Sequence, residues 1–266
     1  MSLLSLVVKP LAYISLPVIL LRSLASISPT CRYYIRLYVY MSTMATAGVV
    51  GSFLAAGMAM VGEKYNVQYV VGRMFYNVAG RLMGIDVVIE GEEYLDVQPA
   101  VLMCNHQSVL DILTVGRIYP KRTTIVSKKS IQYTPLGPFM SMSGAVFINR
   151  GNNASALRSL AAAGETVKSQ RLSLWVYPEG TRRSGEDDAL LPFKKGAFHL
   201  AVQGGLPIIP IVTENYWRIY HKGIFGGGTI KVRVLPPVST TGLTSADVAE
   251  LANTVRDQML KSLREI

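Results

Sequence analysis

The sequence predicts an α/β fold with a mixed, largely parallel sheet of about seven strands covered by helices on both faces. Short runs rich in β-branched residues alternate with stretches of helical spacing, which is typical of such folds. The length of 266 residues accommodates one sizeable domain of this class. An apolar N-terminal region precedes the alternating part and predicts a helical membrane anchor.

The expected strands are short apolar runs that end in polar or glycine-containing turns. They cover residues 87–89, 100–104, 124–126, 145–148, 173–177, 208–212 and 230–235. No internal repeat or linker divides this part of the sequence. We therefore expect one globular domain over residues 65–266, preceded by membrane-associated apolar helices over residues 1–64.

The expected helices have apolar residues at intervals of three or four. An amphipathic helix over residues 68–83 has an apolar side formed by Val71, Phe75, Val78 and Leu82. Further helices are expected at residues 108–118, 154–169, 196–203 and 245–263. The last of them follows a capping pattern from Thr244 to Asp247, and we expect it to pack on the sheet rather than to form a site. Its apolar stripe consists of Val248, Leu251, Val255 and Met259.

The N-terminal region contains two apolar stretches. Residues 39–62 carry no charge over 24 positions, and a hydrocarbon core needs about 20. Residues 1–21 are apolar except for Lys9 and are interrupted by Pro10 and Pro17, so this stretch could span the bilayer, re-enter it or lie in its interface. A second apolar stretch follows the first, which favours an anchor over a removable leader. We expect a membrane location.

The charge balance indicates an acidic partner. The net charge is +10, and residues 117–195 hold thirteen Lys or Arg against five Asp or Glu. Such a surplus favours phosphates, anionic lipid head groups or nucleic acid, and the predicted anchor favours the first two over nucleic acid. Cys31 and Cys104 form neither a disulfide framework nor a zinc-binding spacing, so we expect no metal site.

The run from Asn105 to Asp111 carries the strongest chemical signal. His106 lies in the turn between an expected strand and an expected helix, where a histidine can act as a general base. Ser108 fits the N-cap, which puts Asp111 at the third helical position and within reach of a histidine that precedes the first turn. The alternative is an ordinary capping box beside a hydrogen-bonded structural histidine.

Two further strand ends deliver arginines. The strand at 173–177 is followed by Pro178 to Arg183, where Gly180 lets the backbone approach a ligand and Arg182 offers a planar fork for a phosphate. The strand at 145–148 is followed by Asn149 and Arg150. Each could instead be a solvated surface turn. His199 fits a packed position on a helix, and His221 lies in a glycine- and aromatic-rich loop, so we leave both out of the chemistry.

The combination of these turns indicates a reaction type. Open α/β sheets place their sites at strand ends, where His106, Asp111 and the two arginines are expected. The sequence contains no G-x-S-x-G, P-loop, H-E-x-x-H or G-x-G-x-x-G motif. A base without an obvious protein nucleophile indicates that a substrate hydroxyl is the nucleophile, and the anchor and the basic surplus favour a phosphorylated lipid.

Four ordered motifs resemble those of the glycerolipid acyltransferases. They are Asn105-His106 with Asp111, the run 144–150, the run 177–182 and the run 206–211. The chain is most similar to the 1-acylglycerol-3-phosphate acyltransferase group, and the run 191–200 looks like the fungal type. The resemblance covers about residues 65–266. It implies a glycerolipid acyltransferase fold in this domain and general-base catalysis by His106 with Asp111 as its partner.

The resemblance also implies the substrates. It assigns acceptor binding to Asn105, Arg150, Glu179, Gly180, Thr181 and Arg182. Acyl-CoA would be the co-substrate, lysophosphatidic acid the acceptor and phosphatidic acid the product, with no cofactor and a membrane location, in the endoplasmic reticulum. Residues 128–131 (Lys-Lys-Ser-Ile) and Arg183 depart from common family patterns near the acceptor. Glycerol 3-phosphate or another lysophospholipid is the alternative acceptor, and a non-catalytic lipid-binding protein is the alternative class.

Overall fold

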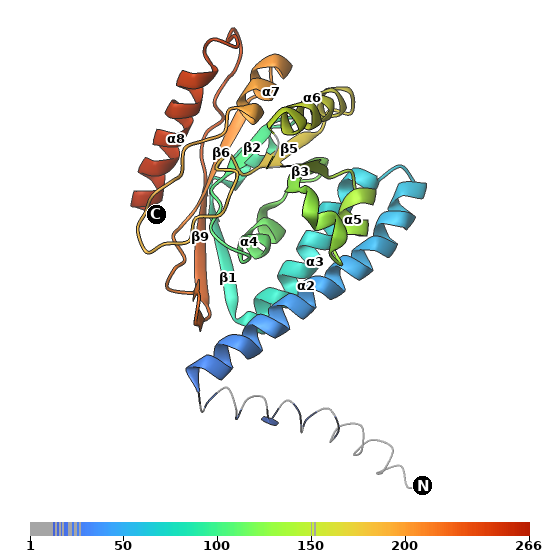
Figure 1. Ribbon diagram of the computed structural model, residues 1–266, viewed down its shortest axis with the longest axis vertical. Coiled ribbons are helices and arrows are strands. Elements are labelled where there is room, and N and C mark those ends of the chain that lie inside the picture. The colour runs from blue at the N-terminus through green and yellow to red at the C-terminus, as the bar shows by residue number, and fades with distance from the viewer. Residues whose placement is uncertain are drawn as a thin grey trace.

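The computed structural model describes residues 13, 15, 17, 19, 20, 23, 26, 28–149, 151 and 153–266. A seven-stranded sheet with the order β1-β9-β6-β2-β5-β3-β4 lies between two layers of helices (Figure 1). Its strands are β1 Ile85–Glu90, β2 Val101–Cys104, β3 Thr123–Lys128, β4 Val146–Ile148, β5 Ser173–Val176, β6 Ile208–Thr213 and β9 Gly228–Val234. These are the seven expected strands, so the predicted α/β fold is confirmed.

The sheet is mixed in a simple way. Only the pair β6–β9 is antiparallel among its neighbours, so β9 and β1 run against the other five strands. In the centre, Leu102 of β2 pairs with Trp175 of β5 on one side and Ile209 of β6 on the other. The hairpin β7 Tyr220–His221 and β8 Ile224–Phe225 was not expected from the sequence.

The helices divide between the two faces of the sheet. The longer elements are α2 Pro29–Met60, α3 Val67–Met83, α4 Asp111–Ile118, α5 Gly137–Met142, α6 Asn153–Ser169, α7 Gly196–Gly204 and α8 Val248–Glu265. Short 3₁₀ turns are η1 Lys64–Asn66, η2 Glu92–Asp96 and η3 Lys129–Tyr133. One face packs against α2 to α5 and the other against α6 to α8 (Figure 1).

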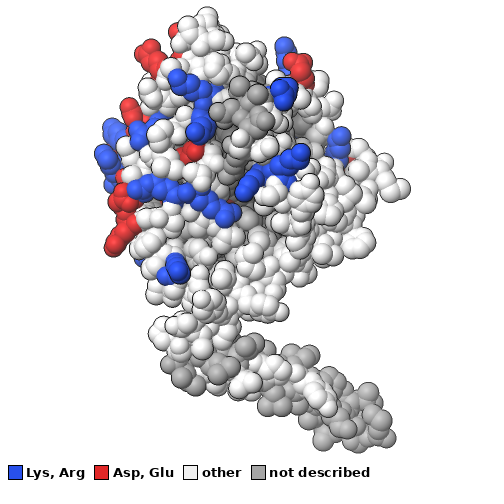
Figure 2. Space-filling view, in the orientation of Figure 1, with Lys and Arg blue, Asp and Glu red and all other residues white. Residues whose placement is uncertain are grey.

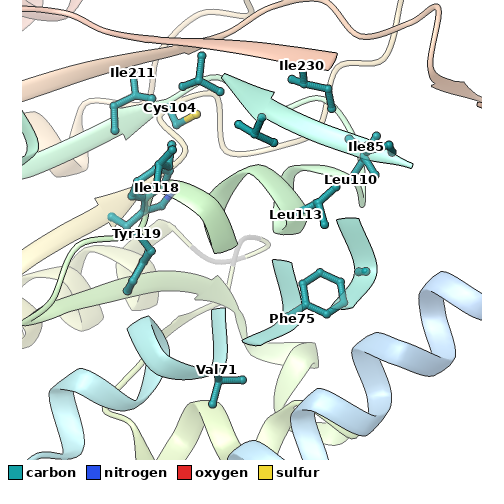
Figure 3. Packing of buried hydrophobic residues seen from close by; sticks show 14 of the residues in the cluster. Val71, Phe75, Ile85, Cys104, Leu110, Leu113, Ile118, Tyr119, Ile211 and Ile230 are labelled. Atoms are coloured by element: carbon teal, nitrogen blue, oxygen red, sulfur yellow. The ribbon is translucent and has the colours of Figure 1, made fainter. Parts of the chain in front are cut away.

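Alternation along the central strands produces two hydrophobic clusters. Leu102 and Cys104 of β2 point to the cluster beneath α2, α3 and α4, whereas Val101 and Met103 point to the cluster beneath α7 and α8. Figure 3 shows Phe75 of α3 and Leu113 of α4 in the first cluster. Both faces are apolar, which explains why these strands are continuous apolar runs in the sequence.

Two helices correct the expected apolar stripes in different ways. In α3 the buried side chains include Val71 and Phe75, but Val78 and Leu82 are 46% and 54% exposed, so the predicted stripe is wrong in its second half. The helix instead buries Ala79 and Met83, because its inner side follows the i, i+4 row that faces α2 and β1. In α8 all four residues of the expected stripe are buried.

Helix α2 has one face on the domain and one face exposed. Tyr40 and Gly51 are buried, and a Cβ on Gly48 would lie 2.8 Å from the Pro135 carbonyl oxygen, so the helix approaches the chain closely here. Tyr38 and Phe53 are 74% and 76% exposed. Figure 2 shows that the described part of α2 presents a largely uncharged surface in this view. Most of the predicted stretch 1–21 lies outside the described residues.

By length and composition, α2 is able to cross a membrane, although 22% of its most apolar 18-residue stretch is buried in the protein. No other helix in the described part of the chain meets these criteria. The packing of α2 against α3 and α5 joins it to the domain along its length. The division of the chain at residue 64 stays a prediction.

Candidate active site

The site begins where β2 ends at the carboxyl edge of the sheet. Asn105 follows the strand and exchanges two hydrogen bonds with the backbone of Thr213 at the end of β6: its Nδ2 donates to the carbonyl oxygen at 2.8 Å, and its Oδ1 accepts from the N–H at 2.8 Å. A buried amide thus extends the sheet by one position. In the structure Asn105 holds the turn that presents His106, and its expected contact with substrate stays a prediction.

His106 and Asp111 are brought together by this turn. The His106 Nδ1 lies 2.7 Å from Asp111 Oδ2, and the two residues are 8% and 2% exposed. The same oxygen accepts from the N–H groups of Gln107 at 2.8 Å and Ser108 at 3.1 Å. A carboxylate at Nδ1 keeps the proton on that nitrogen, which makes Nε2 the hydrogen-bond acceptor of the neutral ring.

The following helix begins two residues later than expected: an N-cap at Ser108 would start it at Val109, whereas α4 begins at Asp111. The side-chain contacts of the predicted capping box are nevertheless present. The carboxylate folds back and accepts from the preceding N–H groups, and Ser108 Oγ accepts from the Leu110 N–H at 3.0 Å. The turn is therefore organised around Asp111, which is why residues five apart can touch.

Two tyrosines complete the surroundings of the pair, and the sequence reasoning missed both. Tyr216, from the loop after β6, places its Oη 2.5 Å from Asp111 Oδ1 and 2.9 Å from Ser108 Oγ. The ring of Tyr177, after β5, stacks on the His106 imidazole with centroids 4.0 Å apart. Tyr177 directly follows β5, and Tyr216 comes three residues after the end of β6. These positions were the available signal, because neighbouring strand ends meet at one edge of the sheet.

Glu179 joins two backbone segments. Its Oε1 accepts from the His106 N–H at 2.8 Å and its Oε2 from the Leu191 N–H at 2.9 Å. Burial raises the pKa of Glu179, while these two hydrogen bonds counter the rise. Each carboxylate oxygen accepts a backbone N–H, so Glu179 positions His106, and its expected contact with substrate stays a prediction.

The turn after β5 brings an arginine to the same place. Gly180 has φ 71° and donates its N–H to the Tyr177 carbonyl oxygen at 3.0 Å, which closes the turn. Thr181 and Arg182 follow on its exposed side. Burial raises the pKa of Tyr177, and the nearby positive charge of Arg182 counters part of this rise. Arg182 is thus close to the His106–Asp111 pair, while Arg150 lies outside the described residues.

A cavity of about 440 Å³ opens beside this pair. Its polar lining consists of His106, Asp111, Thr181, Arg182, Lys128, Gln68 and Ser127. Its remaining walls are mainly apolar and come from α2 to α5, β3 and the segment before α5. The apolar lining includes Met44, Val71, Phe75, Ile112, Val115, Ile125, Leu136, Phe139 and Met140. The cavity therefore joins a base and a cation to a space suited to a hydrocarbon chain.

Among the residues that the structure describes, no group of three or more His, Cys, Asp or Glu side chains is placed to hold a metal ion. His221, set aside in the sequence analysis, stacks on Trp217 with centroids 4.2 Å apart and bonds the Trp217 carbonyl oxygen through Nδ1. Cys104 is buried beside Thr213, and burial raises the pKa of its thiol.

Comparison with known proteins identifies the family of this chain. The acyltransferase family matches residues 86–214. A 1-acyl-sn-glycerol-3-phosphate acyltransferase of Saccharomyces cerevisiae is 41% identical over 88% of this chain and 78% of its own length. The chain belongs to the acyltransferase family. A human 1-acyl-sn-glycerol-3-phosphate acyltransferase beta is 33% identical over 90% of this chain and 87% of its own length.

The fold has a solved counterpart. The crystal structure of a 1-acyl-sn-glycerophosphate acyltransferase from Thermotoga maritima matches with a TM-score of 0.72 and covers 90% of this chain and 97% of that chain. At 23% identity this likeness supports the fold alone. Membership of this family makes the chain an acyltransferase, and the resemblance noted in the sequence is confirmed.

Proposed function

We propose that this acyltransferase moves a fatty acyl group from acyl-CoA to the sn-2 hydroxyl of lysophosphatidic acid and releases phosphatidic acid. The observation that carries the proposal is the 41% identity to the yeast enzyme over most of both chains. The buried His106–Asp111 pair beside an apolar cavity supports it independently, because acyl transfer to a lipid hydroxyl needs a base and a place for hydrocarbon.

The pair accounts for the chemistry of the transfer. His106 Nε2 takes the proton of the acceptor hydroxyl while the hydroxyl oxygen attacks the thioester carbonyl, and general-base assistance is worth about 10²–10⁴ in rate. Asp111 stabilises the imidazolium that forms. When the carbon–sulfur bond breaks, the imidazolium returns its proton to the departing CoA sulfur. The thioester is already activated, so the step requires no cofactor.

The cavity accounts for the binding of the substrates. A fatty acyl chain fits the apolar part between α2, α3 and β3, where burial contributes about 0.8 kcal/mol for each CH₂. The phosphate of the acceptor is assigned to Arg182, whose planar fork can bind it with two hydrogen bonds. Arg150, Thr181 and the turn at Gly180 are assigned to the same acceptor on the basis of the family resemblance.

A bilayer is the proposed source of the acceptor, and the endoplasmic reticulum membrane its proposed location. The exposed face of α2, with Tyr38, Val49 and Phe53, is apolar and lies on the same side of the sheet as the cavity. Its contact with lipid is tested by the double change Val49→Lys and Phe53→Glu. This variant should be released from anionic vesicles in a flotation assay. The control is Ala246→Lys, an exposed position before α8, which should stay bound to the vesicles.

The substrate assignment is tested by measuring CoA release from oleoyl-CoA with each acceptor in turn. Lysophosphatidic acid should give the highest kcat/KM, and glycerol 3-phosphate and lysophosphatidylcholine should give much lower values. Higher turnover with either alternative would replace the acceptor while keeping the reaction. CoA release that does not depend on any acceptor would indicate a thioesterase, and absence of release with all acceptors would favour a lipid-binding protein.

A further inference from the structure

Tyr216 lies next to the reacting pair without being part of the expected motifs. It follows β6 in the loop that leads to the β7–β8 hairpin and is 1% exposed. Its Oη is 2.5 Å from Asp111 Oδ1 and 2.9 Å from Ser108 Oγ. A buried tyrosine hydroxyl with two partners at such distances has a defined orientation.

The direction of these hydrogen bonds follows from the partners. An ionised carboxylate has no proton to give, so Tyr216 donates to Asp111. Ser108 Oγ accepts from the Leu110 N–H at 3.0 Å and is left to donate its own proton to Tyr216 Oη. Burial raises the pKa of Tyr216 well above its ordinary value, and the Asp111 charge adds to the rise, so the donor stays protonated.

The two oxygens of Asp111 therefore have separate holders. Oδ2 faces His106 and accepts from the backbone of residues 107 and 108, which belong to the same turn. Oδ1 accepts a hydrogen bond from Tyr216, which lies 105 residues further along the sequence. Without that second contact the carboxylate could rotate about its Cβ–Cγ bond, and its charge would concentrate on the oxygen that faces the imidazole.

We propose that Tyr216 is a positioning residue for the acyl transfer: its hydroxyl fixes the plane of the Asp111 carboxylate and moderates the charge that this carboxylate presents to His106. The inference rests on the proposed function for its consequence on turnover. The action of Tyr216 on His106 through Asp111 does not depend on the identity of the acceptor.

The sign of the expected pH effect follows from the charges around Asp111. Tyr40 from α2, Cys104 at the end of β2, and Tyr177 and Glu179 after β5 also interact electrostatically with it. Arg182 is the nearby cation, acting on Tyr40 and Tyr177. Loss of the Tyr216 hydroxyl leaves more negative charge toward His106, favours the imidazolium and moves its titration to higher pH.

The test compares Tyr216→Phe with Tyr76→Phe in the full-length protein. Tyr76 is a matched control, because its hydroxyl also donates a hydrogen bond to an aspartate, Asp86, over 2.7 Å. Tyr76 is not among the residues that line the cavity. Tyr216→Phe should lower kcat about tenfold to hundredfold, the loss expected for a hydrogen bond to a charged group. The KM values should change less than threefold, and the acid limb of the pH profile should move up by about half a unit. Tyr76→Phe should match the unaltered protein.

A second measurement removes the dependence on turnover. The chain has three histidines, so NMR of protein labelled at the imidazole carbons can follow each titration, with His106→Ala identifying one signal. The His106 midpoint should rise in Tyr216→Phe and rise less in Ser108→Ala, which keeps the test valid if the first variant does not fold. If the His106 titration is unchanged in the folded variants, Tyr216 does not act on His106. This result is distinct from a failure of acyl transfer itself, which would abolish turnover in every protein while leaving the midpoints measurable.

A double variant separates positioning from general packing. If Tyr216 acts through Asp111, adding Tyr216→Phe to Asp111→Asn should lower kcat no further. If Tyr216→Phe lowers kcat by the same factor in the unaltered protein and in Asp111→Asn, then Tyr216 supports the loop independently of Asp111. That result would overturn the proposal.

Discussion

The two faces of the sheet are packed with similar apolar residues but differ in what these residues form. Beneath α7 and α8, side chains such as Val101, Phe198 and Val255 close into a cluster in which each is fully buried. Beneath α2 to α5, an equally apolar cluster surrounds a cavity of about 440 Å³ that reaches His106. Both faces stabilise the fold through burial of apolar area, and the described residues of the face beneath α2 to α5 also line the cavity that reaches His106.

The difference has a local cause in the helices that cover each face. On the cavity side, α3 and α4 approach each other at two glycines: a Cβ on Gly116 would lie 2.6 Å from the Gly72 carbonyl oxygen. Both glycines line the cavity. Close backbone contact at these glycines holds the two helices together, and the cavity lies beside this contact. The contact between α3 and α4 therefore helps to form the cavity.

The largest expected effect comes from the base on the cavity side. His106→Ala should lower kcat about 10²–10⁴-fold, because the acceptor hydroxyl loses its proton acceptor. His199→Ala, in α7 on the closed side, is the matched control and should stay within about twofold of the unaltered protein, since surface and half-buried changes away from a site are mostly small. Steady-state rates of CoA release measure both. Comparable losses in the two variants would remove the distinction between the faces.

The next effect concerns the cation at the cavity mouth. Arg182→Ala should raise the KM for lysophosphatidic acid about tenfold to hundredfold with a smaller change for acyl-CoA, because a charge-assisted bond to the phosphate is lost. Arg182→Lys should recover only part of this loss, since a point charge lacks the bidentate fork. Arg158→Ala, exposed on α6 at the closed face, is the control. An effect confined to the acyl-CoA KM would reassign Arg182 to the donor.

A smaller effect is expected from filling the cavity. Val115→Phe adds volume to the apolar wall formed by α4. It should lower the kcat/KM ratio of long-chain over short-chain acyl-CoA about tenfold, the scale on which apolar pockets discriminate chain length. A competition assay with two acyl-CoA lengths gives this ratio directly. Equal losses for both lengths would show that the acyl chain does not occupy this part of the cavity.

The smallest effect on activity should come from the closed face. Val255→Ala should lower the free energy of unfolding by about 1–3 kcal/mol, because it removes two buried methyl groups and leaves a void. Its kcat at a temperature well below the unfolding midpoint should be unchanged. Thermal unfolding followed by circular dichroism, together with the CoA-release rate, checks both statements. A selective change in chain-length preference would mean that the two faces are coupled.

Much of the fold and part of the site could be predicted from local sequence. Continuous apolar runs identified each strand of the main sheet, and the stripe from Val248 to Met259 identified α8, because side-chain periodicity is a property of a few adjacent residues. The turn at His106 was also recognisable, since His106 and Asp111 are only five residues apart. The two-residue strands β7 and β8 are too short to show a period, and they were missed.

By itself the sequence determined the strands, the order of the polar turns and the pairing of His106 with Asp111, because these depend on short-range spacing. Only the tertiary structure decided which partners each turn would meet. Asn105 contacts Thr213, 108 residues away, and Asp111 contacts Tyr216, 105 residues away. These contacts require β2 and β6 to be neighbours, and strand order results from packing both apolar faces at once. The same packing turned α3 so that Val78 and Leu82 face outward, and it left the cavity beneath α2.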